Sequence, residues 1–120
     1  MASIRTYRDL LIWQRSKELC KSVYRTTQKM PTSETYGLTI HIRRAAVSIP
    51  SNIAEGYNRK TRPEYIRALR IASGSLAELS TQMQIAEELG MVKAHPEITQ
   101  EMEELDRMIN ALIRKLLPAK

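Results

Sequence analysis

The spacing of apolar residues in two long stretches restricts the fold of this chain more than any other feature. In both stretches an apolar or small residue recurs after four and then after three positions, which is the spacing of a packed seam along an α-helix. The first seam consists of Tyr65, Leu69, Ala72, Leu76, Leu79, Met83 and Ala86. The second consists of Ile98, Met102, Leu105, Ile109, Leu112 and Leu116. We therefore expect the core to form by packing helices against one another.

Residues that begin and end helices mark the boundaries of these stretches. Thr61 followed by Glu64 has the form of a capping box, Pro63 lies in the first turn, and Gly90 ends the first of the two stretches. With similar signals elsewhere, they predict a single domain, residues 1–120, with helices at about 9–29, 33–58, 62–89 and 96–117. Long helices with short connections predict an all-α, up-down-up-down antiparallel four-helix bundle.

The second predicted helix is apolar on two sides. A helix of this kind is usually buried on both sides, and in so short a chain we expect the second partner to be another copy. Pro50 removes a hydrogen bond, but the apolar lines stay in phase across it, so we expect one helix with a kink near Pro50. The first line consists of Leu38, Ile42, Ala45, Ile49, Ile53 and Gly56, and the second of Tyr36, Ile40, Val47 and Ala54.

Four small residues, 72–75, lie in the middle of the third predicted helix. Glycine inside a helix costs about 1 kcal/mol relative to alanine. We therefore expect a close backbone approach to be the reason for Gly74.

Side chains that carry chemistry are scarce. The single cysteine, Cys20, excludes an internal disulfide, and its place on the apolar side of the first predicted helix indicates a buried thiol. His41 and His95 lie far apart and have no cysteine or carboxylate at metal-ligand spacing. The sequence also contains no glycine-rich phosphate-binding loop. We therefore expect a protein that is not an enzyme and that binds neither a metal nor a cofactor.

The sequence also bears on the cellular compartment. It has no apolar run of about 18 residues or more, and its first eight residues lack the apolar stretch of a signal peptide. A single cysteine suits a reducing compartment. We therefore expect a cytoplasmic protein with no membrane partner.

Positive charge is concentrated in the first part of the chain. The net charge is +6, and residues 1–74 hold 14 of the 19 Lys and Arg but only 5 of the 13 Asp and Glu. A basic surface favours polyanions such as nucleic acid. Tyr57 and Tyr65 lie close to the basic residues in the sequence, so their rings could stack on a base. Alternatively, the two halves pair with each other or with a neighbouring subunit. The residues expected to bind nucleic acid are Arg59, Lys60, Arg62, Arg67 and Arg70.

Several motifs extend over nearly the whole chain, namely LIWQ at 11–14, YGLT at 36–39, IRRAA at 42–46, SIPSNIAEG at 48–56 and ASGSLAEL at 72–79. They resemble those of the four-helix-bundle proteins encoded in intervening sequences of bacterial 23S ribosomal RNA genes. The run 43–56 is the most specific part. His41, Tyr7 and Met30 depart from the residues usual in that family, but they lie outside this run.

The resemblance implies a homo-oligomer, known in this family as a ring of five subunits around a central channel. The chain is also similar to the accessory protein of diversity-generating retroelements, which associates with a reverse transcriptase and binds nucleic acid through basic surfaces. The second apolar line is then expected to face another subunit. Independently of the resemblance, the place of Arg43 at the edge of the apolar lines offers an alternative to nucleic-acid binding, namely a bridge to Glu55 or Glu78 of a neighbouring subunit. The residues expected at this interface are Tyr36, Ile40, Arg43, Arg44, Val47 and Glu55.

Two hypotheses for function follow. The first is a non-enzymatic, homo-oligomeric scaffold, a pentamer by resemblance, whose basic surface binds RNA or a ribonucleoprotein. The alternative is a protein–protein interaction module that docks a partner such as a reverse transcriptase without direct nucleic-acid contact.

Overall fold

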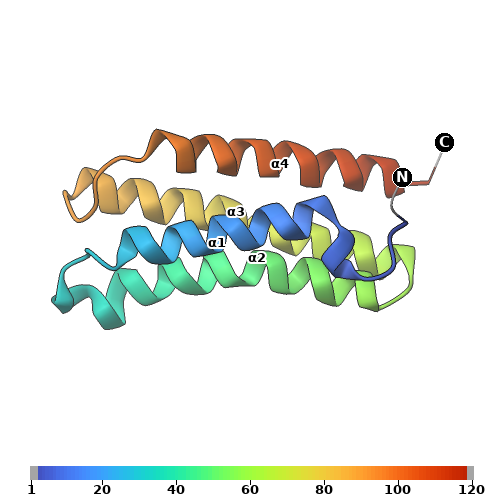
Figure 1. Cartoon of the computed structure of the whole chain (residues 1–120), viewed down its shortest axis with the longest axis horizontal. Helices are drawn as coiled ribbons and strands as arrows, with labels where there is room; N and C mark the ends of the chain where they lie inside the picture. The colour runs from blue at the N-terminus through green and yellow to red at the C-terminus, as the bar shows by residue number, and fades with distance from the viewer. Residues whose placement is uncertain (1–2, 119–120) are drawn as a thin grey trace.

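Four long helices form the part of the chain that the computed structural model describes, residues 3–118. They are α1 (Leu11–Thr27), α2 (Ile40–Asn58), α3 (Arg62–Glu88) and α4 (Pro96–Leu116). Figure 1 shows them lengthwise beside one another, each antiparallel to the next along the chain. α1 packs against α2, α2 against α3, α3 against α4 and α4 against α1, which closes a bundle of 48 × 28 × 25 Å. The predicted up-down-up-down four-helix bundle is confirmed.

The two predicted seams line the core of this bundle. In α3 every seam residue from Leu69 onward is buried, and Tyr65 is half-buried. In α4 the seam holds as far as Ile109, after which Ile113 is buried and Leu112 and Leu116 are only half-buried. The first apolar line of α2 also faces the core. The buried residues of α2 are Ile42, Ala45, Ala46, Ile49, Ile53 and Gly56, and all except Ala46 belong to this line.

The first helix begins later than the sequence indicates. A short 3₁₀ turn, Tyr7–Asp9, comes first, and α1 begins only after Leu10, whose backbone is extended. The carboxylate of Asp9 accepts hydrogen bonds from the backbone N–H groups of Arg5 (2.9 Å) and Thr6 (3.1 Å). These bonds lower the pKa of Asp9. Asp9 therefore holds a separate turn in front of α1.

The second helix also begins later, but it then continues without a break. A 3₁₀ turn, Thr32–Glu34, and a π-helical turn, Thr35–Thr39, precede regular α2. The backbone is not helical at Gly37, and the carboxylate of Glu34 accepts from the N–H of Leu38 (3.2 Å). α2 is continuous through Pro50, so the in-phase lines correctly predicted one helix rather than two. The kink expected at Pro50 stays a prediction.

Small residues bring α2 and α3 close together. A Cβ atom on Gly56 would lie only 2.4 Å from the Cβ of Ala68, so only glycine fits at that position. Further along the same contact, the hydroxyls of Ser48 and Ser75 share a hydrogen bond of 2.8 Å. We call this contact, from Ser48 and Ser75 to Gly56 and Ala68, the α2–α3 seam.

The close approach expected at Gly74 is not found within the chain. Gly74 is exposed, and a Cβ built on it would meet nothing within 4 Å. Its neighbour Ser75 is the small residue that enters the α2–α3 seam. Gly74 faces away from the core, so packing within one chain does not account for this glycine, and a close approach to another copy stays a prediction.

Candidate nucleic-acid interface

The basic residues predicted from the sequence lie at one end of the bundle. Figure 1 shows that the turn between α2 and α3 shares this end with the start of α1 and the end of α4. Antiparallel packing therefore brings two further cations, Arg114 and Lys115 in the last turn of α4, to the same end. All seven side chains are exposed, and we call them the basic end: Arg59, Lys60, Arg62, Arg67, Arg70, Arg114 and Lys115.

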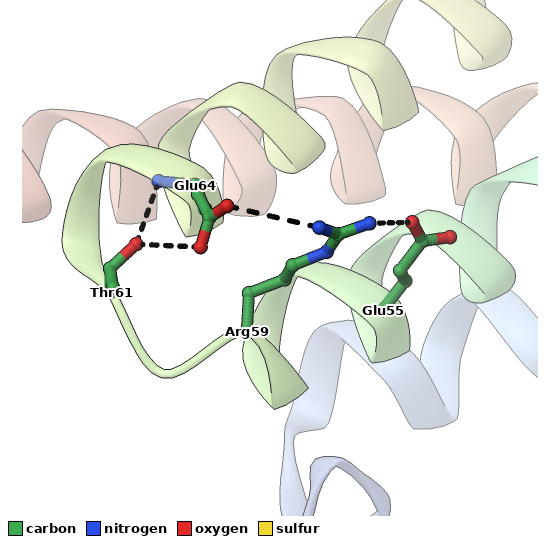
Figure 2. Close-up of polar contacts among 4 residues, drawn as sticks. All are labelled: Glu55, Arg59, Thr61 and Glu64. Carbon is green, nitrogen blue, oxygen red and sulfur yellow. Dashed lines mark hydrogen bonds and ion pairs between the residues drawn. The ribbon is translucent and has the colours of Figure 1, made fainter.

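Arg59 differs from the others because it is paired within the chain. Figure 2 shows its guanidinium between two carboxylates. Its Nη2 lies 3.0 Å from Oε1 of Glu55, and its Nη1 lies 3.8 Å from Oε1 of Glu64. The hydrogen bond and charge of Glu55, and then the charge of Glu64, raise the pKa of Arg59. The two carboxylates offset the positive charge of Arg59, so Arg59 should attract an anionic ligand less strongly than the neighbouring cations do.

A capped turn joins α2 to α3. The hydroxyl of Thr61 accepts from the N–H of Glu64 (3.4 Å) and donates to its Oε2 (3.0 Å), which fixes the start of α3 (Figure 2). Lys60, just before it, has a φ of +68°, in the left-handed region that disfavours side chains with a Cβ. Its ammonium lies 5.5 Å from the ring centroid of Tyr57, within cation–π range. A strained turn therefore presents a lysine at this surface.

The two tyrosines expected to offer ring faces are largely occupied by each other. The rings of Tyr57 and Tyr65 meet edge-to-face, with centroids 5.9 Å apart. Among residues 3–118 the buried hydroxyl of Tyr65 has no hydrogen-bond partner. Burial, and then the neighbouring Tyr57, raises the pKa of Tyr65 to about 12. Tyr65 is therefore a packing residue of the bundle rather than a free platform.

A shallow groove of about 610 Å³ lies on the outer face of α3. Three arginines of the basic end surround it, namely Arg62, Arg67 and Arg70. Its remaining lining residues are Pro63, Ile66, Ile71 and Pro118. This floor could not be predicted from the sequence, because Pro118 comes from the far end of the chain and reaches α3 only in the folded bundle.

The residues expected at a subunit interface lie on the outer side of α2 and just before it. Tyr36 is 89% exposed and Val47 is 41% exposed. Arg44 and Glu55 are exposed, and Ile40 is half-buried. Of the second apolar line, Tyr36 and Val47 are therefore open to solvent and free to contact another subunit, whereas Ile40 and Ala54 are half-buried.

Arg43, placed in the same group, turns back onto its own chain. Its Nε donates to Oγ1 of Thr27 (2.9 Å), and its Nη2 donates to the carbonyl of Tyr24 (3.3 Å). Its guanidinium carbon also lies 4.5 Å from the ring centroid of Tyr24. The bridge to a neighbouring subunit stays a prediction, and it would compete with these contacts.

The rest of the described chain offers little catalytic chemistry. Cys20 is half-buried, and burial raises the pKa of its thiol. Between residues 3 and 118, His, Cys, Asp and Glu side chains nowhere gather in threes to hold a metal ion. Over the same residues, each helix is too short or too polar to cross a membrane.

Comparison with known proteins identifies the family. The family described as 23S rRNA-intervening sequence protein matches residues 8–111. The chain belongs to this family. A solved structure with the same fold, with a TM-score of 0.79, is a protein of unknown function from the S23 ribosomal protein family of Bacteroides thetaiotaomicron. The two chains share 17% sequence identity, and the match covers 86% of this chain and 98% of that one. No curated protein matches.

Proposed function

We propose that this protein is a non-enzymatic, homo-oligomeric scaffold whose basic end binds RNA or a ribonucleoprotein. One observation carries the proposal. Apart from Arg59, the cations of the basic end are exposed and make no ion pair within the described residues. Guanidinium groups match the geometry of phosphates, and unpaired cations on one surface attract a polyanion. The residues concerned are Lys60, Arg62, Arg67, Arg70, Arg114 and Lys115.

Titration against a single-stranded RNA at several salt concentrations tests this proposal. If about five phosphates are neutralised, the logarithm of affinity should fall against that of salt with a slope of about −3.5 for single-stranded RNA. Wild-type protein that binds no RNA even at low salt would contradict it.

A matched pair of variants locates the binding surface. The test variant combines Lys60→Glu, Arg62→Glu and Arg67→Glu, and it should bind at least about tenfold more weakly with a slope reduced by about 2. The control combines Arg25→Glu, Lys29→Glu and Lys93→Glu, three residues around a pocket between the end of α1 and the loop before α4. This control has the same net charge, but its changes lie at the opposite end of the bundle. Equal losses in the two variants would show that net charge, not the basic end, governs binding.

The assembly part of the proposal rests on the outward apolar line of α2. A large apolar residue that is nine-tenths exposed, as Tyr36 is, suits a contact with a second copy. Light scattering of the eluted protein should give a multiple of 13.8 kDa, and five subunits are expected from the resemblance. Val47→Asp should dissociate the oligomer, while Ile85→Asp on α3, with a similar exposure, should not. A monomeric wild type would contradict the proposed assembly.

The same outward line favours a second candidate function, docking of a protein such as a reverse transcriptase without direct nucleic-acid contact. Capture of that protein after nuclease treatment, together with no binding of RNA, would favour this function over the first.

A further inference from the structure

The groove on the outer face of α3 combines two properties that a purely phosphate-binding surface does not need. Its floor is made of the apolar side chains Pro63, Ile66, Ile71 and Pro118. Ile71 in particular is 46% exposed, although a large apolar side chain gains from burial. A surface that bound only phosphates would need the cations but not this floor. The groove is therefore suited to a ligand with both an apolar face and negative charge.

The charges around the floor indicate which class of anionic ligand the groove would bind. Arg62, Arg67 and Arg70 line the groove, and none of them makes an ion pair or side-chain hydrogen bond within residues 3–118. Arg62 and Arg70 are eight residues apart on α3, or about 12 Å along the helix axis. Planar guanidinium groups bind phosphates in pairs of hydrogen bonds and also stack on bases. The groove thus offers an apolar seat with phosphate-binding groups along its length.

Size and shape favour a single strand over two other occupants. A stable protein–protein interface uses roughly 20 to 30 residues on each side, whereas this groove has seven lining residues. Duplex RNA keeps its bases stacked and presents mainly phosphates and 2′-hydroxyls, so its bases would leave the apolar floor unused. A single strand exposes both base faces and phosphates. The volume of about 610 Å³ is within the range of small-ligand sites, about 300 to 1,000 Å³.

We propose that this groove seats an unstacked base of single-stranded RNA, while Arg62, Arg67 and Arg70 hold the neighbouring phosphates. The proposal rests on the proposed RNA binding and assigns to it a strand type and a base contact. In this proposal a base binds in the groove rather than on Tyr65, because the ring of Tyr65 is packed against Tyr57.

The decisive experiment compares two ligands with equal charge. One is a fluorescent oligouridylate, and the other is an abasic ribose-phosphate oligomer of the same length. The wild type should prefer oligouridylate by roughly fivefold to tenfold, toward the lower end of measured base-stacking effects because the floor is aliphatic. Ile71→Ser should remove this preference and leave the affinity for a blunt RNA duplex within about twofold.

Ile85→Ser is the matched control, since Ile85 is also on α3 and is 44% exposed, outside the groove. This variant should keep the preference for oligouridylate. Circular dichroism should show native helix content in both variants, so a loss of binding in Ile71→Ser would not come from unfolding.

The outcomes separate this inference from the function on which it rests. If no RNA binds in a salt-dependent way, the proposed function fails. If RNA binds but the wild type shows no preference over the abasic oligomer, or if the two serine variants behave alike, only the base seat is overturned. Equal affinity for an oligoglutamate of the same charge would also overturn it, because charge alone would then account for binding.

Discussion

Two glycines in neighbouring helices are under opposite constraints. Gly56 of α2 lies in the α2–α3 seam, where a Cβ atom would come within 2.4 Å of Ala68. Gly74 of α3 lies on the outer surface, with nothing within 4 Å of the space for its Cβ. The packing of one chain therefore explains Gly56 and leaves Gly74 unexplained. The seam is fixed by the fold, whereas the outer surface of α3 is open to constraints from a ligand or another copy.

The largest expected effect is a loss of stability when a larger side chain is placed in the α2–α3 seam. Gly56→Val should lower the free energy of unfolding by about 3 kcal/mol, because the added side chain must separate two packed helices. Urea denaturation measures this loss, and Gly74→Val is the control at an open position. Similar losses in the two variants would remove the contrast between them.

The next effect concerns Tyr65, which packs beside Gly56 in the same region. Its pKa is about 12 in the folded state, above the ordinary value of about 10. The unfolded chain therefore releases this proton first, so the stabilisation is complete below about pH 10 and is lost between about pH 10 and 12. After allowance for the partly exposed ring, the loss should be about 1–2 kcal/mol.

Tyr65→Phe isolates this effect, because it removes the ionisable hydroxyl and keeps the ring. The variant should be at least as stable as the wild type at pH 7, because the hydroxyl has no hydrogen-bond partner in the described chain. Unfolding curves at pH 7, 9 and 11 should show a shallower alkaline loss for the variant. Parallel pH profiles would show that the hydroxyl is solvated.

On the outer surface, Lys60→Gly should raise stability and lower RNA affinity together. Glycine adopts the left-handed conformation of residue 60 without strain, which should add about 1 kcal/mol to the free energy of unfolding. The loss of one cation should weaken RNA binding and reduce the salt slope by about 0.7. Thermal melts and RNA titrations on one preparation measure both. A gain in stability with unchanged affinity would remove Lys60 from the binding surface.

The smallest effect concerns Gly74 itself. Gly74→Ala should stabilise an isolated bundle by somewhat less than about 1 kcal/mol, because alanine forms helix more readily and has room here. The measurement is best made at protein concentrations above and below dissociation of the oligomer. A gain seen only in the dissociated protein would place Gly74 against a neighbouring copy.

The sequence predicted those parts of the fold that depend on local pattern. The seam from Leu69 to Ala86, the Thr61 cap and the continuity of α2 through Pro50 all follow from spacing and capping chemistry. The same spacing contained the signal that Gly74 faces outward. Residue 74 is about 200° around the helix from Ala72, which is buried.

The candidate site could be predicted only in part. Its arginines near the α2–α3 turn form a cluster in the sequence, but Arg114 and Pro118 join them only through antiparallel packing. The pairing of Arg59 with Glu55 has the i,i+4 spacing of a helical ion pair and could have been predicted, whereas its contact with Glu64 depends on how the turn folds. The delayed start of α2 follows from the backbone at Gly37, where glycine permits a conformation outside the helical pattern.

The position of the two chain ends has a practical consequence. The described chain begins and finishes at the basic end of the bundle (Figure 1). An affinity tag or a fluorescent protein that follows Pro118 would therefore start beside the groove, which Pro118 lines, and could block it or repel RNA. The loop at residues 91–94 lies at the opposite end of the 48 Å long axis. A small label attached there would allow the protein to be immobilised with its basic end facing solution.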